Sequence, residues 1–371
     1  MKISIQSHIL RDGLNKVLTV IDKKNTRPIL TNCLVEASDN KIELIATDLE
    51  VAAKVILNAD VTEKGRFCIN TKNIFEIVRE LPDELVEIDI DQNKNVLNLS
   101  CQKINYSLLV TNSDDYPQVN LDNVGNSIKI KSSDIGKIIT KTSHAISNDE
   151  TRINLSGIYL QKLENKLRAV AIDGHRLALL DLLGFEYENS SLEDGVIVPK
   201  KGIAELKKLA DANNNSDISL SLDESFVYAS IENEYYLSIR LIAREYPKYQ
   251  TVIPSKTSYR LELEKNSLLN AVKRIRILSN EKTNAIKFTL SPNELKISAD
   301  HPSLGHAVES LPINYDGKEM QIGFNAKYMI ESLAVLDSNE VIFEFNNELK
   351  PVIVRSDEEE NFLGIIMPLK I

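Results

Sequence analysis

The segment AIDGHRLALL, residues 171–180, places an acid, an imidazole and a guanidinium within four positions. Asp173 and His175 could form an acid–base site with Arg176, because a carboxylate can orient an imidazole for proton transfer. A single His where a strand meets a turn is more often structural or part of a binding surface. An enzyme that uses Asp173 and His175 is therefore the competing interpretation, and a binding surface is the leading one.

No other spacing of residues indicates catalysis, a metal ion or a cofactor. The chain has no G-x-S-x-G, Walker A, dinucleotide-binding or HExxH motif. His301 and His306 are five residues apart, so they do not share a helix face, and no Cys lies near them. Cys33, Cys68 and Cys101 are more than thirty residues apart, which excludes CxxC metal and redox sites. We expect no catalytic residue, no metal and no cofactor.

The length and composition are those of an ordinary globular protein. The chain has 371 residues, enough for two or three domains, with 43% hydrophobic and 26% charged residues. The N-terminus lacks the apolar core of a secretory signal, and no stretch approaches the roughly 18 apolar residues that span a bilayer. An odd number of cysteines suits a reducing compartment. We expect a cytoplasmic protein with no membrane partner.

The elements that would position these residues recur three times along the chain. Each copy begins with an amphipathic helix, whose apolar face lies within residues 10–21, 135–142 and 268–275. A strand that ends in Asp follows each helix, and a second helix with a Lys at its start comes next. The matching residues are Asp48, Asp173 and Asp300, spaced by 125 and 127, and Lys72, Lys201 and Lys327, spaced by 129 and 126.

A strand that closes on Pro117, Pro247 and Pro368 completes the three copies. Within each copy the order is strand, helix, several strands, helix, several strands, and most of the strands alternate with period two. This order predicts an α+β fold of three tandem domains, with antiparallel sheets and two helices per domain. We place the domains at residues 1–124, 125–255 and 256–371.

Charge is distributed unevenly between the predicted helices and the remainder. The chain has 44 Lys and Arg against 54 Asp and Glu, a net −10, which argues against an ordinary basic nucleic-acid binder. The six predicted helices nevertheless carry 18 basic against 10 acidic residues, a net +8, which leaves −18 for strands and loops. A Lys-rich solvent face is the plain explanation for one such helix. A basic layer repeated along the chain favours non-specific contact with DNA phosphates.

The C-terminal segment GIIMPLKI, residues 364–371, is apolar with one Pro and is typical of an edge strand. An exposed apolar tail beside another domain would equally form a groove for a partner peptide. A peptide-binding scaffold with no DNA role is therefore a third hypothesis.

Six motifs in this order resemble the bacterial sliding clamp family, the beta subunit of DNA polymerase III. They are TRPILTN from Thr26, DGHRLAL from Asp173, YPKYQTVIP from Tyr246, ILSNEK from Ile277, FNAKY from Phe324 and IIMPLKI at the chain end. The resemblance covers the full chain. It implies a homodimeric, non-enzymatic ring that encircles duplex DNA, with helices lining the hole and sheets outside. Sliding then needs only sequence-independent phosphate contacts that salt screens.

The resemblance also implies a partner-peptide groove between the second and third domains. Its lining would be Leu155, Gly174, His175, Arg176, Leu177, Pro247, Val252, Asn325, Tyr328, Ile365, Met367, Pro368 and Leu369. Implied partners are the replicative DNA polymerase catalytic subunit with its 3'-5' exonuclease complex, the clamp loader, other DNA polymerases, and mismatch-repair and ligase-type proteins. For Leu155, Leu177 and Ile365, each taken singly, the alternative to a groove position is an ordinary place in the hydrophobic core.

Other positions match the family's DNA and subunit contacts. Lys24 and Arg152 match basic positions of the bore, and charge and helix placement add Lys201, Lys273 and Arg274. Tyr106 and Leu108 match one side of the subunit interface, and Ile277 and Leu278 match the other. Four positions depart from the family pattern: Ile172 replaces a hydroxyl residue, Asp149 an uncharged polar residue, Asn154 an aromatic residue and Lys370 an arginine.

Overall fold

The computed structural model of the chain describes residues 1–21, 26–91, 94–121, 126–212, 216–231 and 234–370. The chain forms two compact units, Met1–Ile135 with Ala204–Leu241 and Gly136–Ile203 with Ile242–Ile371. Each unit holds one eight-stranded sheet and one smaller sheet. The fold is α+β, as predicted. The three domain boundaries stay a prediction, because both units include residues of the second predicted copy.

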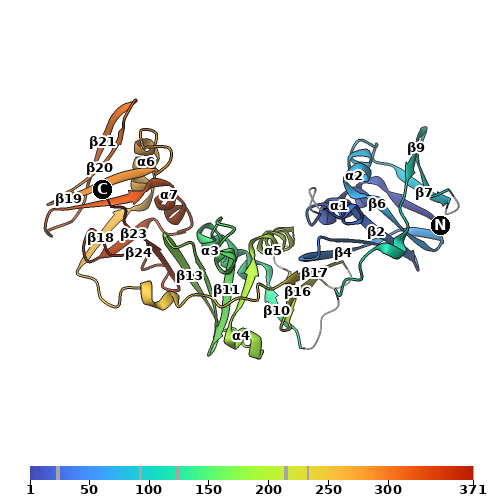
Figure 1. The fold of residues 1–371 in the computed structure, drawn as a ribbon, viewed down its shortest axis with the longest axis horizontal. Helices are drawn as coiled ribbons and strands as arrows, with labels where there is room; N and C mark the ends of the chain where they lie inside the picture. The colour runs from blue at the N-terminus through green and yellow to red at the C-terminus, as the bar shows by residue number, and fades with distance from the viewer. Residues whose placement is uncertain (22–25, 92–93, 122–125, 213–215, 232–233, 371) are drawn as a thin grey trace. The chain divides into compact units, whose positions relative to one another are not determined.

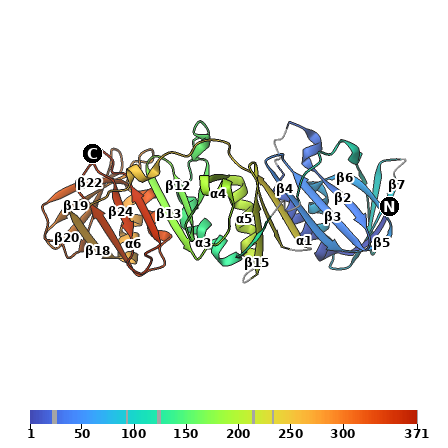
Figure 2. The same ribbon diagram turned by 90° about the horizontal axis from the view of Figure 1, so that it is seen from below.

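The first unit contains two antiparallel sheets. The smaller sheet has the order β5 (Asp60–Glu63), β1 (Lys2–Gln6), β7 (Leu85–Asp91), β8 (Val96–Cys101), β9 (Ile104–Leu109). The larger sheet has the order β10 (Ile128–Lys131), β15 (Asp217–Leu222), β16 (Phe226–Ile231), β17 (Tyr235–Arg240), β4 (Val51–Asn58), β3 (Lys41–Thr47), β2 (Asn32–Ser38), β6 (Gly65–Asn70). Figure 2 shows β2 and β3 side by side in the larger sheet.

The second unit repeats this arrangement. Its larger sheet has the order β14 (Val196–Pro199), β11 (Gly157–Leu163), β12 (Lys166–Ile172), β13 (Arg176–Leu183), β25 (Phe362–Ile366), β24 (Val352–Arg355), β23 (Glu340–Phe345), β18 (Tyr259–Glu264). Its smaller sheet has the order β21 (Gly305–Pro312), β20 (Glu294–His301), β19 (Ala285–Ser291), β22 (Met320–Asn325). All these pairs are antiparallel.

Each larger sheet joins four strands of one copy to four strands of the next. In the first unit β4 pairs with β17, with Val51 opposite Ile239. In the second unit β13 pairs with β25, with Arg176 opposite Ile366. We call these two strand pairs the first and the second junction. The smaller sheets end in β9 and β21, which occupy edge positions in the described chain.

All six predicted helices are present. They are α1 (Ser7–Leu18), α2 (Thr71–Arg79), α3 (Ser132–Thr142), α5 (Lys200–Ala212), α6 (Lys265–Arg276) and α7 (Ala326–Ala334). A short helix that the sequence did not predict, α4 (Ser190–Asp194), precedes β14. Figure 1 shows α1 and α2 side by side in the first unit, where they pack together. Among the described residues, no helix is long and apolar enough to cross a membrane.

Apolar periodicity determines which face of these helices is buried, and side-chain capping determines where they begin. The predicted faces of α1 and α6 are buried, including Leu14 at 1% and Leu268 at 0% exposure. The side chain of Asn70 accepts a hydrogen bond from the backbone of Asn73 and so caps α2, and Glu264 caps α6 in the same way. The helices therefore begin directly where the preceding strands end.

Two predictions about strands are wrong. The C-terminal segment is not an edge strand, because β25 lies between β13 and β24. No strand reaches the recurring prolines either: β9 ends at Leu109, β17 at Arg240 and β25 at Ile366. Pro368 follows a central strand without interrupting it, since proline cannot donate to the ladder but tolerates a position beyond it.

Within the second unit, the side chain of Lys141 on α3 forms polar contacts with residues of the third copy. Its buried ammonium donates to the backbone carbonyl of Val335 and forms ion pairs with Glu359 and, at 2.9 Å, with Asp337. The ring of Phe362 lies 5.5 Å from the same nitrogen. Such a cluster is costly to break, because a buried charge that loses its partner keeps its desolvation cost.

Replacing Lys141 by Met should lower the free energy of unfolding by about 3 kcal/mol, because the Glu359 carboxylate then loses its cation. Urea unfolding followed by circular dichroism measures the change. Lys137→Met, on the exposed side of the same helix, is the matched control and should change stability by less than about 0.5 kcal/mol. Equal effects of the two substitutions would contradict the role of Lys141.

Candidate functional site

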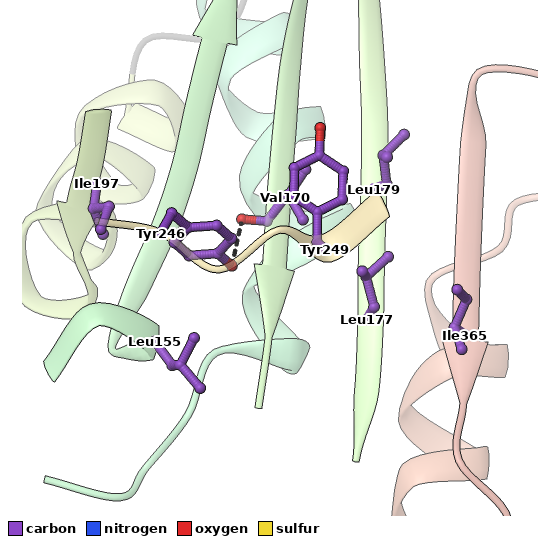
Figure 3. Packing of buried hydrophobic residues seen from close by; sticks show 8 residues of the cluster. All are labelled: Leu155, Val170, Leu177, Leu179, Ile197, Tyr246, Tyr249 and Ile365. Carbon is purple, nitrogen blue, oxygen red and sulfur yellow. Dashed lines mark hydrogen bonds between the residues drawn. The ribbon is translucent and has the colours of Figure 1, made fainter. Parts of the chain in front are cut away.

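An apolar cluster lies beside the second junction, wholly within the second unit (Figure 3). Eight buried side chains form it: Leu155, Val170, Leu177, Leu179, Ile197, Tyr246, Tyr249 and Ile365. Partly buried side chains pack against them, and these include Tyr159, Ile172, Ile242 and Val252. The cluster combines residues from β11, β12, β13, β14 and β25 with the segment that leads out of the second copy.

Three tyrosines close one side of this cluster. The rings of Tyr159 and Tyr246 stack with centroids 4.6 Å apart and planes 8° from parallel. The hydroxyl of Tyr246 donates to the backbone carbonyl of Val170 at 3.3 Å, as Figure 3 shows. Burial raises the pKa of Tyr246, so the phenol stays neutral. The segment that carries Tyr246 and Tyr249 is thereby fixed against the sheet.

The turn between β12 and β13 is organised by one carboxylate. Oδ1 of Asp173 accepts hydrogen bonds from the backbone amides of His175 and Arg176, at 2.8 and 2.9 Å. Gly174 takes a φ of +89°, a conformation that glycine adopts without the penalty of a Cβ. This geometry exposes the side chain of His175 and turns that of Arg176 inward.

Arg176 is 5% exposed and has a carboxylate on each side. Its Nε donates to Asp173 at 3.0 Å, and its Nη1 donates to Glu331 of α7. The guanidinium lies 4.4 Å from the ring centroid of Tyr328, on which the ring of His175 also stacks at 5.9 Å. Asp173 thus binds a guanidinium and two amides, and these hydrogen bonds position the turn.

The chain end is bound to the same region through its backbone. The amide of Met367 donates to the carbonyl of His175, and the amide of Leu369 donates to the carbonyl of Gly323, both at 2.8 Å. Asn325 caps α7 by accepting from the amides of Lys327 and Tyr328. The side chains of Met367, Pro368 and Leu369 remain half-buried, so they present apolar surface beside His175.

All thirteen residues predicted to line a groove belong to the second unit, and most of them contact this region. Pro247 is exposed next to Tyr246, and Val252 packs against the cluster. The sequence did not single out Tyr159, Tyr249 or Ile242. Tyr159 lies on β11, far along the chain from Tyr246 and Tyr249, so no local sequence signal marks the stacking of these rings.

Arg152, predicted to contact DNA, lies at the same turn. Its Nη1 approaches the backbone carbonyl of Asp173 at 3.5 Å, and its Nε pairs with Asp149 at 3.4 Å. Asp149 also accepts from Thr151, and that hydrogen bond lowers the pKa of its carboxyl group. Two of the positions that depart from the family pattern lie near this turn. Asp149 is linked to it through Arg152, and Ile172 packs against the apolar cluster.

The other predicted DNA contacts differ in how free their charges are. Lys24 lies outside the described residues, and Lys201 is half-buried and has interactions of its own. Arg274 donates to the Glu309 carboxylate through Nη2 at 2.5 Å and through Nε at 2.9 Å. Lys273 instead lines a pocket of about 520 Å³, which we call the basic pocket, with Arg276, Ile277, Ser279, Glu281, Asn284 and Lys327.

The predicted interface residues lie on the edge strand β9 or directly after α6. Tyr106 and Leu108 belong to β9, where Tyr106 is 36% exposed. Ile277 and Leu278 follow α6 directly, and Ile277 is 76% exposed. Large exposed apolar side chains at a sheet edge are unusual for a surface that stays in water.

Comparisons with known proteins cover the whole chain. Three family models match in order: the DNA polymerase III beta subunit N-terminal domain at residues 1–122, central domain at 129–248 and C-terminal domain at 250–370. The beta sliding clamps of Caulobacter vibrioides and Pseudomonas putida are 30% and 29% identical to it over 100% of both chains.

Solved structures agree with these matches. The crystal structure of DNA polymerase III subunit beta from Pseudomonas aeruginosa superposes with a TM-score of 0.93 at 28% identity. A DnaN sliding clamp from Bartonella birtlesii, bound to griselimycin, gives 0.94 at 28% identity. Both comparisons cover 100% of each chain. The likeness therefore extends over all three tandem copies.

His144, in the turn after α3, should make stability depend on pH. Burial, and secondly the charge of Arg176, lower its pKa to about 3 from 6.5, and its Nδ1 is buried without a hydrogen-bond partner. The unfolded chain binds a proton near pH 6.5 and the folded chain does not, so stability falls as the pH decreases from 6.5 towards 3.

Between pH 7 and pH 5 the wild-type chain should lose about 2 kcal/mol more stability than His144→Leu, because the variant lacks this proton. Urea midpoints at the two pH values measure the difference. Equal losses of stability in the wild type and in His144→Leu would show that His144 binds its proton in the folded state as readily as in the unfolded chain.

Proposed function

The chain belongs to the DNA polymerase III beta subunit family and is a sliding clamp, a processivity factor of DNA polymerase, and from this premise we propose how its surfaces serve that role. The role entails duplex DNA, a second copy of the chain and a polymerase as partners. A clamp is an accessory factor, and we propose that it has no catalytic residue and no cofactor. The clamp loader and repair proteins are further proposed partners, and the cytoplasm is the proposed compartment.

The pattern of strand junctions carries the proposal of a closed ring. β4 and β13 occupy matching places in the first and second copies, and β21 takes that place in the third. β17 and β25 match β9 of the first copy in the same way. The first and second junctions pair these strands within the chain, so a third junction would pair β21 with β9 of another copy. Two such contacts, each head to tail, close a dimer.

Exposed apolar side chains support that third junction. Leu109 on β9 is 83% exposed, and Val308 on β21 is 53% exposed. Ile277 adds a further exposed side chain next to α6. An unpaired edge strand with apolar side chains promotes association. Pairing it with one defined partner satisfies the backbone groups and removes this surface from water.

For DNA, the basic pocket is the surface we favour in the second unit. Lys273, Arg276 and Lys327 line it together with Glu281, and the Lys327 ammonium lies 4.0 Å from Glu331, whereas Arg274 is bound by Glu309 at 2.5 Å. Their contacts with phosphates would be independent of sequence and weakened by salt. A weak attraction suits sliding, because tight binding to individual phosphates would slow translocation.

For partner proteins, we propose that peptide segments bind beside the second junction. His175, Met367 and Leu369 present half-buried or exposed surface over a fixed apolar cluster. Methionine adapts to several ligand shapes, and a rigid floor reduces the entropy lost on binding. A segment with Leu or Phe side chains would gain most from this surface.

The ring can be tested by its topology. A fluorescent chain loaded on nicked circular DNA should stay bound in single-molecule or gel-filtration assays, and linearising the DNA should release it. Leu109→Glu should lose retention on the circle, because a carboxylate on the exposed edge of β9 opposes closure at the third junction. Leu349→Glu, which alters a 58% exposed leucine elsewhere, is the matched control and should be retained.

A second arm of this experiment tests the basic pocket. Lys273→Glu with Lys327→Glu should shorten the residence time on linear DNA roughly tenfold at low salt, because phosphate contacts contribute additively to the logarithm of affinity, and should leave retention on the circle unchanged. Lys256→Glu with Lys350→Glu reverses two lysines that line another pocket and should change little. Release at equal rates from circular and linear DNA would exclude the ring.

Partner binding can be tested at the chain end. Met367→Ala should weaken binding of the replicative polymerase catalytic subunit by about 2 kcal/mol, near thirtyfold, in calorimetry. Met320→Ala, a half-buried methionine on β22, is the control and should leave the affinity unchanged. Sedimentation should give the dimer mass for both variants. Unchanged affinity in Met367→Ala would assign the polymerase to another surface.

A further inference from the structure

The first junction carries a pocket of its own, wholly within the first unit. It has a volume of about 240 Å³, and the β3–β4 turn, residues 118–120, β16 and β17 surround it. Leu49, Val51 and Phe226 give it an apolar wall, and Glu50 and Arg240 add one charge of each sign. We call this site the first-junction pocket.

This pocket corresponds to the candidate site of the second unit. Oδ1 of Asp48 accepts hydrogen bonds from the backbone amides of Glu50 and Val51, at 3.0 and 2.8 Å. Asp173 accepts from the amides two and three residues after it in the same way. Val51 lies opposite Ile239, as Arg176 lies opposite Ile366. Arg240 therefore takes the place that Met367 has at the second junction.

The side chains differ in a way that leaves the first-junction pocket open and apolar. Val51 stands where Arg176 fills the corresponding space with its guanidinium. Leu49 stands where Gly174 does, and it keeps a φ of +78°. A leucine at positive φ is strained, and strain of this kind accumulates where a surface has a function. Its side chain is 41% exposed at the pocket.

Charge and volume restrict what the pocket can bind. Arg240 is exposed and lies over the ring of Phe226 at 5.3 Å, and in the described part of the chain no carboxylate forms an ion pair with it. A guanidinium held on an aromatic ring keeps its edge for a carboxylate. Pockets for whole small molecules measure about 300–1,000 Å³, so 240 Å³ suits one or two apolar side chains of a longer segment.

We propose that the first-junction pocket binds an extended peptide segment of a partner protein, which inserts a Leu or Phe side chain beside Leu49 and carries an Asp or Glu for Arg240. The comparison with the second junction rests on the proposed peptide role of that site. The acidic residue distinguishes the two sites, because Met367 offers no charge where Arg240 does.

Methyl NMR of the full-length chain, labelled at Leu, Val and Ala, tests this proposal with two probes. Acetyl-Ser-Leu-Phe-Asp-Ser-amide should shift the methyl signals of Leu49, Val51 and Val119 in a saturable manner. The probe with Asn in place of Asp should bind at least fivefold more weakly. Arg240→Gln should remove that difference, because the charge-assisted hydrogen bonds are lost.

Leu49→Gly separates binding from folding. Glycine accepts the positive φ, so the thermal midpoint should be unchanged or higher, while the Asp probe should bind at least fivefold more weakly. Binding that is as strong in Leu49→Gly as in the wild type would overturn the proposal. Absence of shifts up to millimolar probe, or equal affinity for both probes, would overturn it as well.

Two further outcomes are distinguishable. Methyl shifts at Leu49 that change on dilution without any peptide would assign the pocket to a second copy of the chain and contradict the proposal. In Met367→Ala, persistence of the Leu49 shifts would support the first-junction pocket whatever the polymerase does. Loss of polymerase binding in that variant concerns the second junction alone.

Discussion

The constraint on which this structure depends is the pairing of backbone hydrogen bonds across the boundaries between copies. In the first and second copies the half-sheets end in β4 and β13, whose amides and carbonyls need hydrogen-bond partners. The next copy supplies the missing strand, β17 or β25, in an antiparallel register. Core packing, the position of the chain end and the geometry of both Asp-containing turns follow from these two ladders.

The two junctions have the same strand register, so the differences between their surfaces come from their side chains. At the second junction, Arg176 is enclosed by Asp173, Glu331 and the ring of Tyr328, so its charge is compensated and the turn is rigid. At the first junction, Val51 needs no compensation and leaves space. Side-chain differences at a few turn and strand positions thus open a pocket at the first junction, where the second is filled by Arg176, while the strand register stays the same.

Much of the fold could be predicted from the sequence. The apolar faces of α1, α3 and α6 and the recurring Asp and Lys residues revealed three tandem α+β copies, because helix periodicity and spacing are local signals. Strand order was not accessible in this way. The sequence of residues 364–371 predicts an edge strand, whereas β25 is a central one, because a Pro indicates an edge only when it lies inside the ladder.

The candidate site was predictable only in part. The residues around His175 and Met367 came from the family resemblance, whereas Tyr159 and Tyr249 were missed because aromatic stacking joins segments that are far apart in the sequence. Arg274 was grouped with the free basic residues, but its partner Glu309 lies 35 residues away on another element. Charge counts along a helix cannot detect such pairs.

The first junction also has a consequence for the order of events during synthesis. β4 and its partner β17 are separated by about 180 residues, since Val55 pairs with Tyr235. At roughly 5–20 residues per second, β17 leaves the ribosome about 10–40 s after β4. During that interval the half-sheet that includes β3 and β4 has an open edge. A nascent chain in this state carries an unpaired strand edge that favours association with other chains, and this exposure ends only when most of the second copy has been made.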